Sequence, residues 1–156
     1  MKKIFFTGLL VLIDQLTKII ISSFFMGFKK VFHDFIGFTP YLNTSQLSIF
    51  NNELDMDLSN VYLSLINVLI IDVLVLLYLY LKKHSNQTSI RNINFMFVFM
   101  MAGTSCSLID KIFWGGSLDY IRILSKIVDL KDIYLVCGLV FYFLWAFSLK
   151  PKTKAG

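Results

Sequence analysis

Residues 102–138 read AGTSCSLIDKIFWGGSLDYIRILSKIVDLKDIYLVCG and contain the end of one long apolar segment and the start of another. Asp110, Asp119 and Asp132 lie at or just beyond the ends of these two segments. An ionised side chain deep in a lipid bilayer costs on the order of 3 kcal/mol on insertion scales, so carboxylates at the rim of a helix bundle are candidates for function. The stretch therefore predicts two membrane helices whose ends carry a group of acidic side chains.

The whole chain is strongly apolar. Of its 156 residues, 56% are hydrophobic, 16 are Phe, and only 16% are charged. This composition argues against a soluble domain, and the length argues against more than one domain. We therefore expect residues 1–156 to form a single integral membrane domain. The formal net charge of +5 would by itself fit a nucleic-acid ligand, but its distribution follows the ends of the apolar segments, so we expect no nucleic-acid partner.

Four apolar segments are long enough to cross the bilayer core, which is about 30 Å thick and needs roughly 20 residues of helix. They are residues 4–25, 61–81, 93–113 and 132–149. The chain is therefore predicted to be an all-α membrane protein with four transmembrane helices. Segments 26–60 and 114–131 would connect these helices on one side of the membrane.

Basic residues indicate which side that is. Of the 15 basic residues, eight stand before the first helix, between the second and third, and after the fourth: Lys2, Lys3, Lys82, Lys83, Arg91, Lys150, Lys152 and Lys154. None of these three segments contains an acid. Cytoplasmic loops carry an excess of Lys and Arg. We therefore expect both termini in the cytoplasm and segments 26–60 and 114–131 on the outer face.

The outer segment after the first helix has the composition of short strands. FKKVFHDFIGFTPYLNTSQLSIF, residues 28–50, mixes aromatic and β-branched residues with Gly, Pro and Asn at turn positions. We expect a small extracytoplasmic β-like segment here. Its aromatic side chains would lie on lipid headgroups or close over a groove.

Three charged residues lie away from the ends of the predicted helices. Asp14 and Lys18 are four positions apart, so they share one helix face and can neutralise each other. This pair could serve function or only hold helices together. Asp72 lies near the middle of the second helix with no partner in that helix, so we expect it to face the bundle interior and bond to a neighbouring helix.

Asp119 and Asp132 suggest a specific chemistry. Two carboxylates within hydrogen-bonding reach share one proton, so the ionised one can activate a water while the protonated one polarises a peptide carbonyl. No metal or cofactor is then required, and the sequence contains no HExxH, GxSxG or phosphate-loop motif. Alternatively, Asp132 is simply a helix-start residue favoured by the helix dipole.

Blocks of sequence resemble the motifs of one family, in order along nearly the whole chain. The first is DQLTK at residues 14–18, which is close to DQxTK. The second is NTSQLSIF, which begins at Asn43 and resembles NxGxAF. The third is CSLIDK, which resembles GNxxDR with Asp110 in place, Ser107 for Asn and Lys111 for Arg.

The last two blocks contain the aspartate pair. GGSLDYI resembles xVVDF and places Asp119 on the motif's aspartate. VDLKDIYLVCG resembles FNxADxxxxxG, with Asp132 on the aspartate, Asp129 for Asn and Lys131 for Ala. A cation at Lys131 favours an ionised Asp132, and the charge of Asp129 offsets it. Together the blocks resemble the type II, or lipoprotein, signal peptidases of bacteria.

This resemblance implies a function and a site. It implies cleavage of a lipid-modified signal peptide just before the diacylglyceryl-cysteine of a prolipoprotein, at the outer face of the bacterial cytoplasmic (inner) membrane. It implies that Asp119 and Asp132 are catalytic. The residues implied to bind substrate or support the pair are Asp14, Lys18, Asn43, Ser107, Asp110, Lys111 and Asp129. The expected partners are prolipoprotein signal peptides and membrane lipids, with no cofactor, and we expect a monomer.

Two alternatives remain open from the sequence. A catalytically degenerate homologue would bind lipidated peptides or a membrane partner without cleavage. A small transporter or channel component would use its intramembrane Asp14, Lys18, Asp72 and Asp110 to line a polar path.

Overall fold

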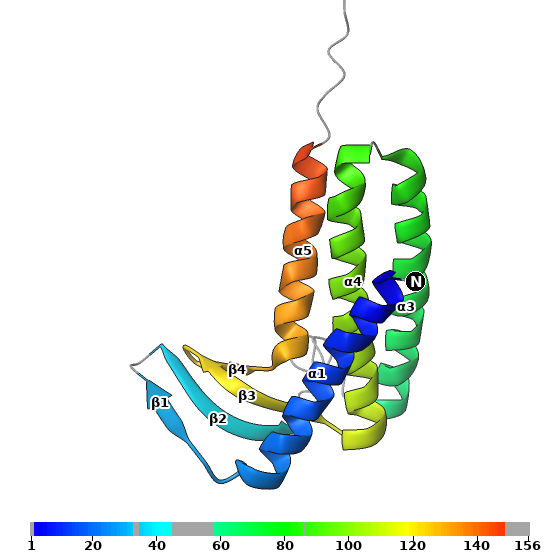
Figure 1. Ribbon diagram of the computed structural model, residues 1–156. Helices are drawn as coiled ribbons and strands as arrows, with labels where there is room; N and C mark the ends of the chain where they lie inside the picture. The colour runs from blue at the N-terminus through cyan, green and yellow to red at the C-terminus, as the bar shows by residue number, and fades with distance from the viewer. Residues whose placement is uncertain (1, 33–34, 45–57, 86, 149–156) are drawn as a thin grey trace, which may run out of the picture.

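A computed structural model describes residues 2–32, 35–44, 58–85 and 87–148. Its helices are α1 (Lys2–Phe24), α3 (Asn60–His84), α4 (Gln87–Ile109), and α5 (Leu130–Ser148), with α4 continued by the π-helical turn η1 (Asp110–Trp114). Four helices are long and apolar enough to cross a membrane, with α4 and η1 together forming one of them. The four predicted spans are therefore confirmed (Figure 1).

The helix boundaries differ from the predicted ones by a few residues. The largest difference is at α4, which starts at Gln87 rather than at residue 93. Apolar composition detects the part of a helix that lies in lipid, whereas backbone hydrogen bonding continues into the polar residues beyond it. Residues 45–57 and 149–156, which include the last predicted boundary and the three C-terminal lysines, lie outside the described part of the chain.

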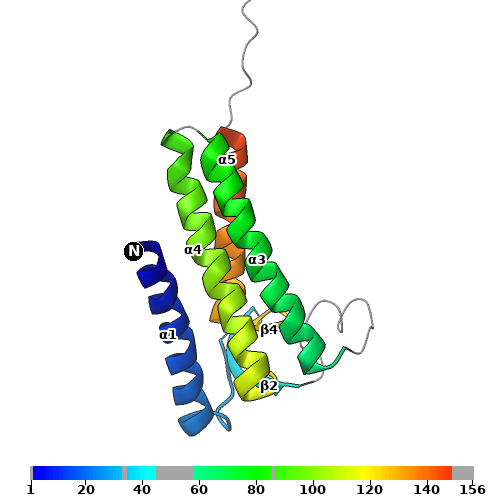
Figure 2. The same cartoon turned by 90° about the vertical axis from the view of Figure 1, so that its right-hand side faces the viewer.

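Helix α4 is the centre of the bundle, because it packs against α1, α3 and α5 (Figure 2). Two glycines allow α4 and α5 to approach closely. A Cβ atom at Gly103 of α4 would lie 2.7 Å from Leu135 Cγ, and one at Gly138 of α5 would lie 2.5 Å from Met100 Cγ. Small residues at such an interface let two membrane helices pack backbone to backbone. The position of the start of α5 relative to α4 follows from this contact.

A four-stranded antiparallel sheet lies at the end of the bundle opposite the α3–α4 connection (Figure 1). Its strands are β1 (Lys30–Phe32), β2 (Ile36–Asn43), β3 (Ser117–Ile123) and β4 (Lys126–Val128), in the order β1-β2-β3-β4. The β-like segment predicted after the first helix is confirmed by β1 and β2.

Half of the sheet comes from a segment for which we did not predict strands. Residues 114–131 were expected only to connect two helices, but they supply β3 and β4. Strand β3 pairs with β2, which places Ser117 opposite Asn43 and Asp119 opposite Tyr41. Tyr120 and Leu118 of β3 then pack with Ile21 of α1 in a buried apolar cluster. This packing ties the strand that carries Asp119 to the first helix.

The prediction for Asp72 is wrong. Helix α3 buries Leu63, Asn67, Leu74, Tyr78 and Leu81, whereas Asp72 is exposed on the outer surface of the helix. At about 100° per residue, Asp72 lies about 160° around the helix axis from Leu74, so it cannot face α4. Its carboxylate points away from the bundle, toward the surface that lipid would cover.

Candidate active site

The end of α4 sets the path of the chain into the site. The chain turns out of η1 at Gly115, whose φ of 61° is a left-handed conformation that glycine adopts without strain. Gly116 follows, and a Cβ atom there would lie 2.5 Å from the Asn43 carbonyl oxygen. Only a glycine therefore lets β3 begin directly against β2. A π-helical turn of this kind is often found at a functional site.

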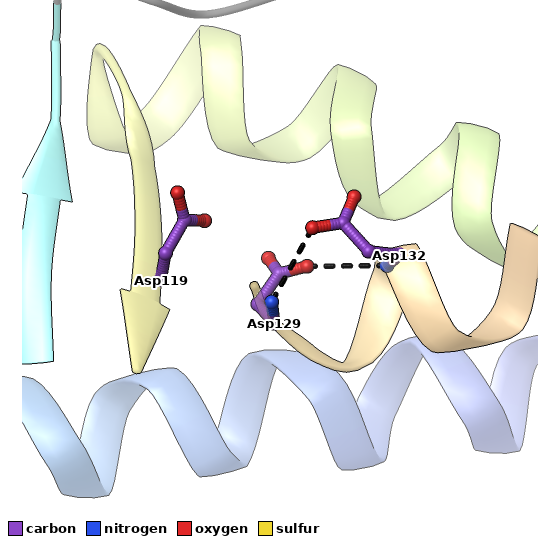
Figure 3. Close-up of side chains that lie close together, drawn as sticks. All are labelled: Asp119, Asp129 and Asp132. Carbon is purple, nitrogen blue, oxygen red and sulfur yellow. Dashed lines mark hydrogen bonds between the residues drawn. The ribbon is translucent and has the colours of Figure 1, made fainter. Parts of the chain in front are cut away.

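Three carboxylates converge where β3, the β4–α5 connection and α5 meet. One oxygen of each of Asp119, Asp129 and Asp132 lies within 4.8 Å of the others (Figure 3). Asp119 and Asp129 are buried, with 8% and 0% of their surface exposed, and Asp132 is half-buried. The structure thus brings Asp119 and Asp132 together, as the sequence led us to expect, and it adds Asp129 between the elements that carry them.

Asp129 and Asp132 cap the start of α5 reciprocally. The Asp132 backbone N–H donates to Asp129 Oδ1 at 3.2 Å, and the Asp129 backbone N–H donates to Asp132 Oδ2 at 3.4 Å (Figure 3). This is the hydrogen-bond pattern of a capping box, with an acid at both positions. Asp132 therefore has the helix-start role that we considered as an alternative. The same contacts hold its carboxylate in a defined orientation toward β3.

Lys18 connects the first helix to this site. Its Nζ lies 3.0 Å from Asp14 Oδ2, which confirms the predicted pairing of these two residues. The same nitrogen lies 2.6 Å from Asp110 Oδ2 and 2.7 Å from Asp129 Oδ2. Lys18 and Asp14 are completely buried. The pair is thus part of a network of charges that reaches from α1 to α5, rather than a self-contained contact.

A second ammonium group, that of Lys131, lies beside Asp119 and Asp132, which together are called the dyad. Lys131 Nζ is 2.5 Å from Asp129 Oδ2, 3.2 Å from Asp110 Oδ2 and 3.7 Å from Asp119 Oδ1. It also donates a short hydrogen bond to Ser117 Oγ, which in turn donates to Asp119 Oδ1 at 2.6 Å.

Lys131 and Ser117 were not among the predicted site residues. Signals for both were present. Lys131 is adjacent to Asp132, and Ser117 lies two positions before Asp119, so on a strand it shares that residue's face. Gln15 was also missed, although it belongs to the DQLTK block. Its Nε2 donates to Asp14 and Asp110 at 3.0 and 3.2 Å, and its Oε1 accepts from Trp114 Nε1 at 3.1 Å.

The remaining predicted residues lie nearby. Asn43 ends β2, and its side chain hydrogen-bonds to Asp119. Lys111 Nζ donates to Ser107 Oγ at 2.7 Å, one helical turn away. These two residues therefore contact each other. Among the described hydrogen bonds and ion pairs, Ser107 and Lys111 have none to a carboxylate.

The charges around the two acids outside the helices act in opposite directions. Burial raises the pKa of Asp119, and the nearby Lys131 ammonium only partly offsets this. Burial alone would also raise the pKa of Asp129, but the ammonium groups of Lys131 and Lys18 outweigh it and hold the pKa below its usual range. Asp129 is therefore an ionised partner of the two lysines, and Asp119 is the acid that retains a proton more readily.

The three carboxylates also resemble a set of metal ligands, since hard divalent cations bind such oxygens. However, Lys131 Nζ already lies 2.5 Å from Asp129 and 3.7 Å from Asp119. A metal ion bound between these oxygens would have to displace the ammonium group. The donor set therefore suits a bound water better than a metal ion.

Comparisons with known proteins agree with this architecture. A family model described as signal peptidase (SPase) II matches residues 6–148. Two solved structures of a bacterial membrane enzyme, obtained by the in meso method at 2.3 and 1.9 Å, are each similar to this chain with a TM-score of 0.73 and 21% sequence identity. The matches cover 99% of this chain and 93% of the first structure, and 96% and 94% for the second.

Comparison with curated proteins found no match. The two structural matches establish the fold, and the family model covers nearly the whole described chain, including every residue of the carboxylate network. The chain therefore belongs to the signal peptidase II family.

Proposed function

We propose that this protein is an aspartyl endopeptidase at the membrane surface that cleaves the signal peptides of lipid-modified prolipoproteins before the diacylglyceryl-cysteine. The observation that carries the proposal is the convergence of Asp119 and Asp132 from a strand and a helix, with their carboxylates within 4.8 Å. A gap of this size accommodates one water hydrogen-bonded to both acids, at about 2.8 Å from each.

In this proposal the two acids share one proton. The ionised carboxylate removes a proton from the water as it attacks the scissile carbonyl, and the protonated carboxyl donates a hydrogen bond to the carbonyl oxygen. Behind them, Lys18 forms ion pairs with Asp14, Asp110 and Asp129, and among the described residues it forms none with Asp119 or Asp132. Its role would be to keep the start of α5 and the strand β3 in fixed relative positions.

A lipid-facing groove offers a place for the apolar part of a substrate. It has a volume of about 400 Å³ and lies between α3 and the end of α4. Leu65, Val68, Leu108 and Ile112 supply apolar walls, and Lys111 lies at its lining. A signal-peptide helix or an acyl chain could enter such a groove sideways from the bilayer, without crossing water.

The proposed location is the outer face of the bacterial cytoplasmic membrane. The sheet and the carboxylates lie at one end of the bundle, whereas Lys82, Lys83 and Arg91 lie around the α3–α4 connection at the other end (Figure 1). The positive-inside rule supports a cytoplasmic location for the lysine-rich end and for both termini. The proposed partners are prolipoproteins and lipids, the proposed state is a monomer, and no cofactor is needed.

One observation favours a second candidate, a homologue that binds lipidated peptides without cleaving them. Lys131 places a cation 3.7 Å from Asp119, which opposes the effect of burial and favours the ionised form of that acid over the shared proton. The transporter alternative has less support. Asp14, Lys18 and Asp110 contact one another in a closed network, and Asp72 lies on the outer surface, so these residues do not line one path.

The test is cleavage of a diacylglyceryl-modified prolipoprotein by the purified protein in detergent. Wild type should cleave before the lipidated cysteine, and Asp119→Asn and Asp132→Asn should each abolish cleavage. The two variants should still bind the substrate, measured by fluorescence polarisation of a labelled lipopeptide. Binding by folded wild type without cleavage, over pH 4–9 and several prolipoproteins, would instead support the non-cleaving homologue.

A further inference from the structure

The carboxylate network has an unusual charge balance. Five acids belong to it, and two ammonium groups contact them: Asp14, Asp110, Asp119, Asp129, Asp132, Lys18 and Lys131. Asp129 and Lys131 contribute one charge of each sign and contact each other at 2.5 Å. Removing both would leave the sum of the charges unchanged. Removing either one would change that sum by a full unit inside a buried site.

Lys131 lies next to Asp119, and Asp129 lies next to Asp132, so each residue of the ion pair is linked to one acid of the dyad. Lys131 reaches Asp119 through the Ser117 hydroxyl, which accepts from Lys131 Nζ and donates to Asp119 Oδ1 at 2.6 Å. Asp129 reaches Asp132 through the two reciprocal backbone-to-carboxylate bonds at 3.2 and 3.4 Å. The ion pair therefore links the strand that carries one acid to the helix that carries the other.

The direction of the Ser117 hydrogen bonds constrains Asp119. Because the Lys131 ammonium has only protons to donate, Ser117 Oγ must accept from it and use its own proton toward a carboxylate. The nearer acceptor is Asp119 Oδ1 at 2.6 Å, whereas Asp129 Oδ2 lies at 3.5 Å. That oxygen of Asp119 is therefore an acceptor without a proton. The other oxygen, or Asp132, is left to hold the shared proton.

We propose that Asp129 and Lys131 act as one charge-neutral pair of positioning residues, which aligns Asp119 with Asp132 and maintains a single proton on them. This inference rests on the proposed function. It also accounts for two of the four departures from the sequence pattern that the chain resembles, those at Asp129 and Lys131. An acid in place of Asn and a lysine in place of Ala cancel in charge, so together they preserve the balance that either alone would disturb.

The single substitutions should have opposite effects on protonation. Asp129→Asn removes the carboxylate nearest to the Lys131 ammonium and leaves it with Asp110 at 3.2 Å, so the site becomes one unit more positive and the shared proton should be lost at lower pH. Lys131→Ala removes a cation from the same site, so both acids should hold protons to higher pH. The other charges that face the dyad stay in place in both variants: Asp14 and Lys18 from α1, and Asp110 and Lys111 from η1.

The double variant Asp129→Asn/Lys131→Ala should recover. Asn is as good an N-cap residue as Asp, so its side-chain oxygen can still accept from the Asp132 N–H. Residues in one salt-bridge network couple by up to about 3 kcal/mol, equivalent to about 100-fold, so each single variant should lose up to about that much in kcat/KM. The double variant should lie within about fivefold of wild type.

The experiment measures kcat/KM against pH for wild type, both single variants and the double variant, with a diacylglyceryl-modified prolipoprotein. We expect Asp129→Asn to shift the pH profile to lower pH and Lys131→Ala to shift it to higher pH. The double variant should return the profile to the wild-type position. A purely structural role would lower activity without moving the profiles in opposite directions. Lys131→Met, which keeps the length but not the charge, should behave like Lys131→Ala. Additive losses in the double variant, or profiles that move in the same direction, would overturn the proposal.

Thermal unfolding of the same four proteins in detergent provides a readout that needs no cleavage. Each single variant should lower Tm, and the double variant should recover most of the loss. If wild type does not cleave but the double variant recovers its Tm, the proposed function is refuted and the pairing is supported. Cleavage by wild type with no recovery, in either activity or Tm, would refute the pairing while supporting the function.

Discussion

The most direct test of the charge network is Lys18→Met. Lys18 Nζ lies 2.6–3.0 Å from the carboxylates of Asp14, Asp110 and Asp129, and the side chain is completely buried. At an effective dielectric constant of about 20, a contact of this length is worth about 6 kcal/mol of Coulomb energy before desolvation is subtracted. Desolvation cancels most of that gain, and breaking a buried pair by removing one partner typically costs 3–5 kcal/mol.

Met has nearly the volume of Lys, so the substitution removes the charge and leaves little cavity. We therefore expect Lys18→Met to lower the free energy of unfolding by about 3–5 kcal/mol, because three buried carboxylates lose a shared cation. The assay is reversible unfolding in mixed micelles with increasing SDS, followed by tryptophan fluorescence. Trp114 donates to Gln15 next to Asp14 and so reports on this region.

The matched control is Lys111→Met. Lys111 is also a buried lysine, but its Nζ contacts only Ser107 among the hydrogen bonds and ion pairs described. It should cost less, no more than about 1.5–3 kcal/mol, the net value of a hydrogen bond made by a charged group. Equal losses for the two variants would show that the carboxylates around Lys18 are not held by its charge, and the electrostatic account of this network would be wrong.

Three further predictions concern the turn, the dyad and the lipid-facing surface. Gly116→Ala should lower Tm and cleavage together, because its Cβ would lie 2.5 Å from the Asn43 carbonyl oxygen; an unchanged Tm would mean that β3 can shift freely. Asp119→Asn should raise Tm, and more at pH 8 than at pH 4. The reason is that burial raises the folded-state pKa of Asp119, so the stability that its protonated form provides is lost as pH rises. A pH-independent difference in Tm would argue against this. Asp72→Leu should leave kcat/KM unchanged and improve membrane insertion by roughly 3 kcal/mol, measured as the inserted fraction in a translocon assay; a loss of cleavage would show that the carboxylate has a role that its position does not reveal.

Local patterns were enough to predict much of this protein. The lengths of the apolar segments identified the four membrane helices, because the bilayer thickness sets the number of residues needed to cross it. The four-residue spacing of Asp14 and Lys18 predicted their contact, since such residues are neighbours on any α-helix. The turn-rich composition of residues 28–50 predicted strands after the first helix, and β1 and β2 are found there.

Other features depend on partners far away in the chain. Strand β3 forms because β2 pairs with it, and a strand gains its hydrogen bonds only from a neighbour, so residues 117–123 do not predict a sheet by themselves. Lys131 was recognised as a departure from a motif. That its ammonium group contacts Ser117, Asp110 and Asp129 depends on how α5 packs against α4.

The sequence by itself therefore determined the membrane class, the four helices and the identity of the acids near their ends. Hydropathy, helical spacing and side-chain chemistry are properties of short segments, and they hold whatever the rest of the chain does. Only the tertiary structure decided that Asp72 faces outward and that Lys18 joins α1 to Asp129 of the site. These outcomes depend on the rotation of each helix about its axis and on side chains that meet across more than a hundred residues, and no local pattern specifies either.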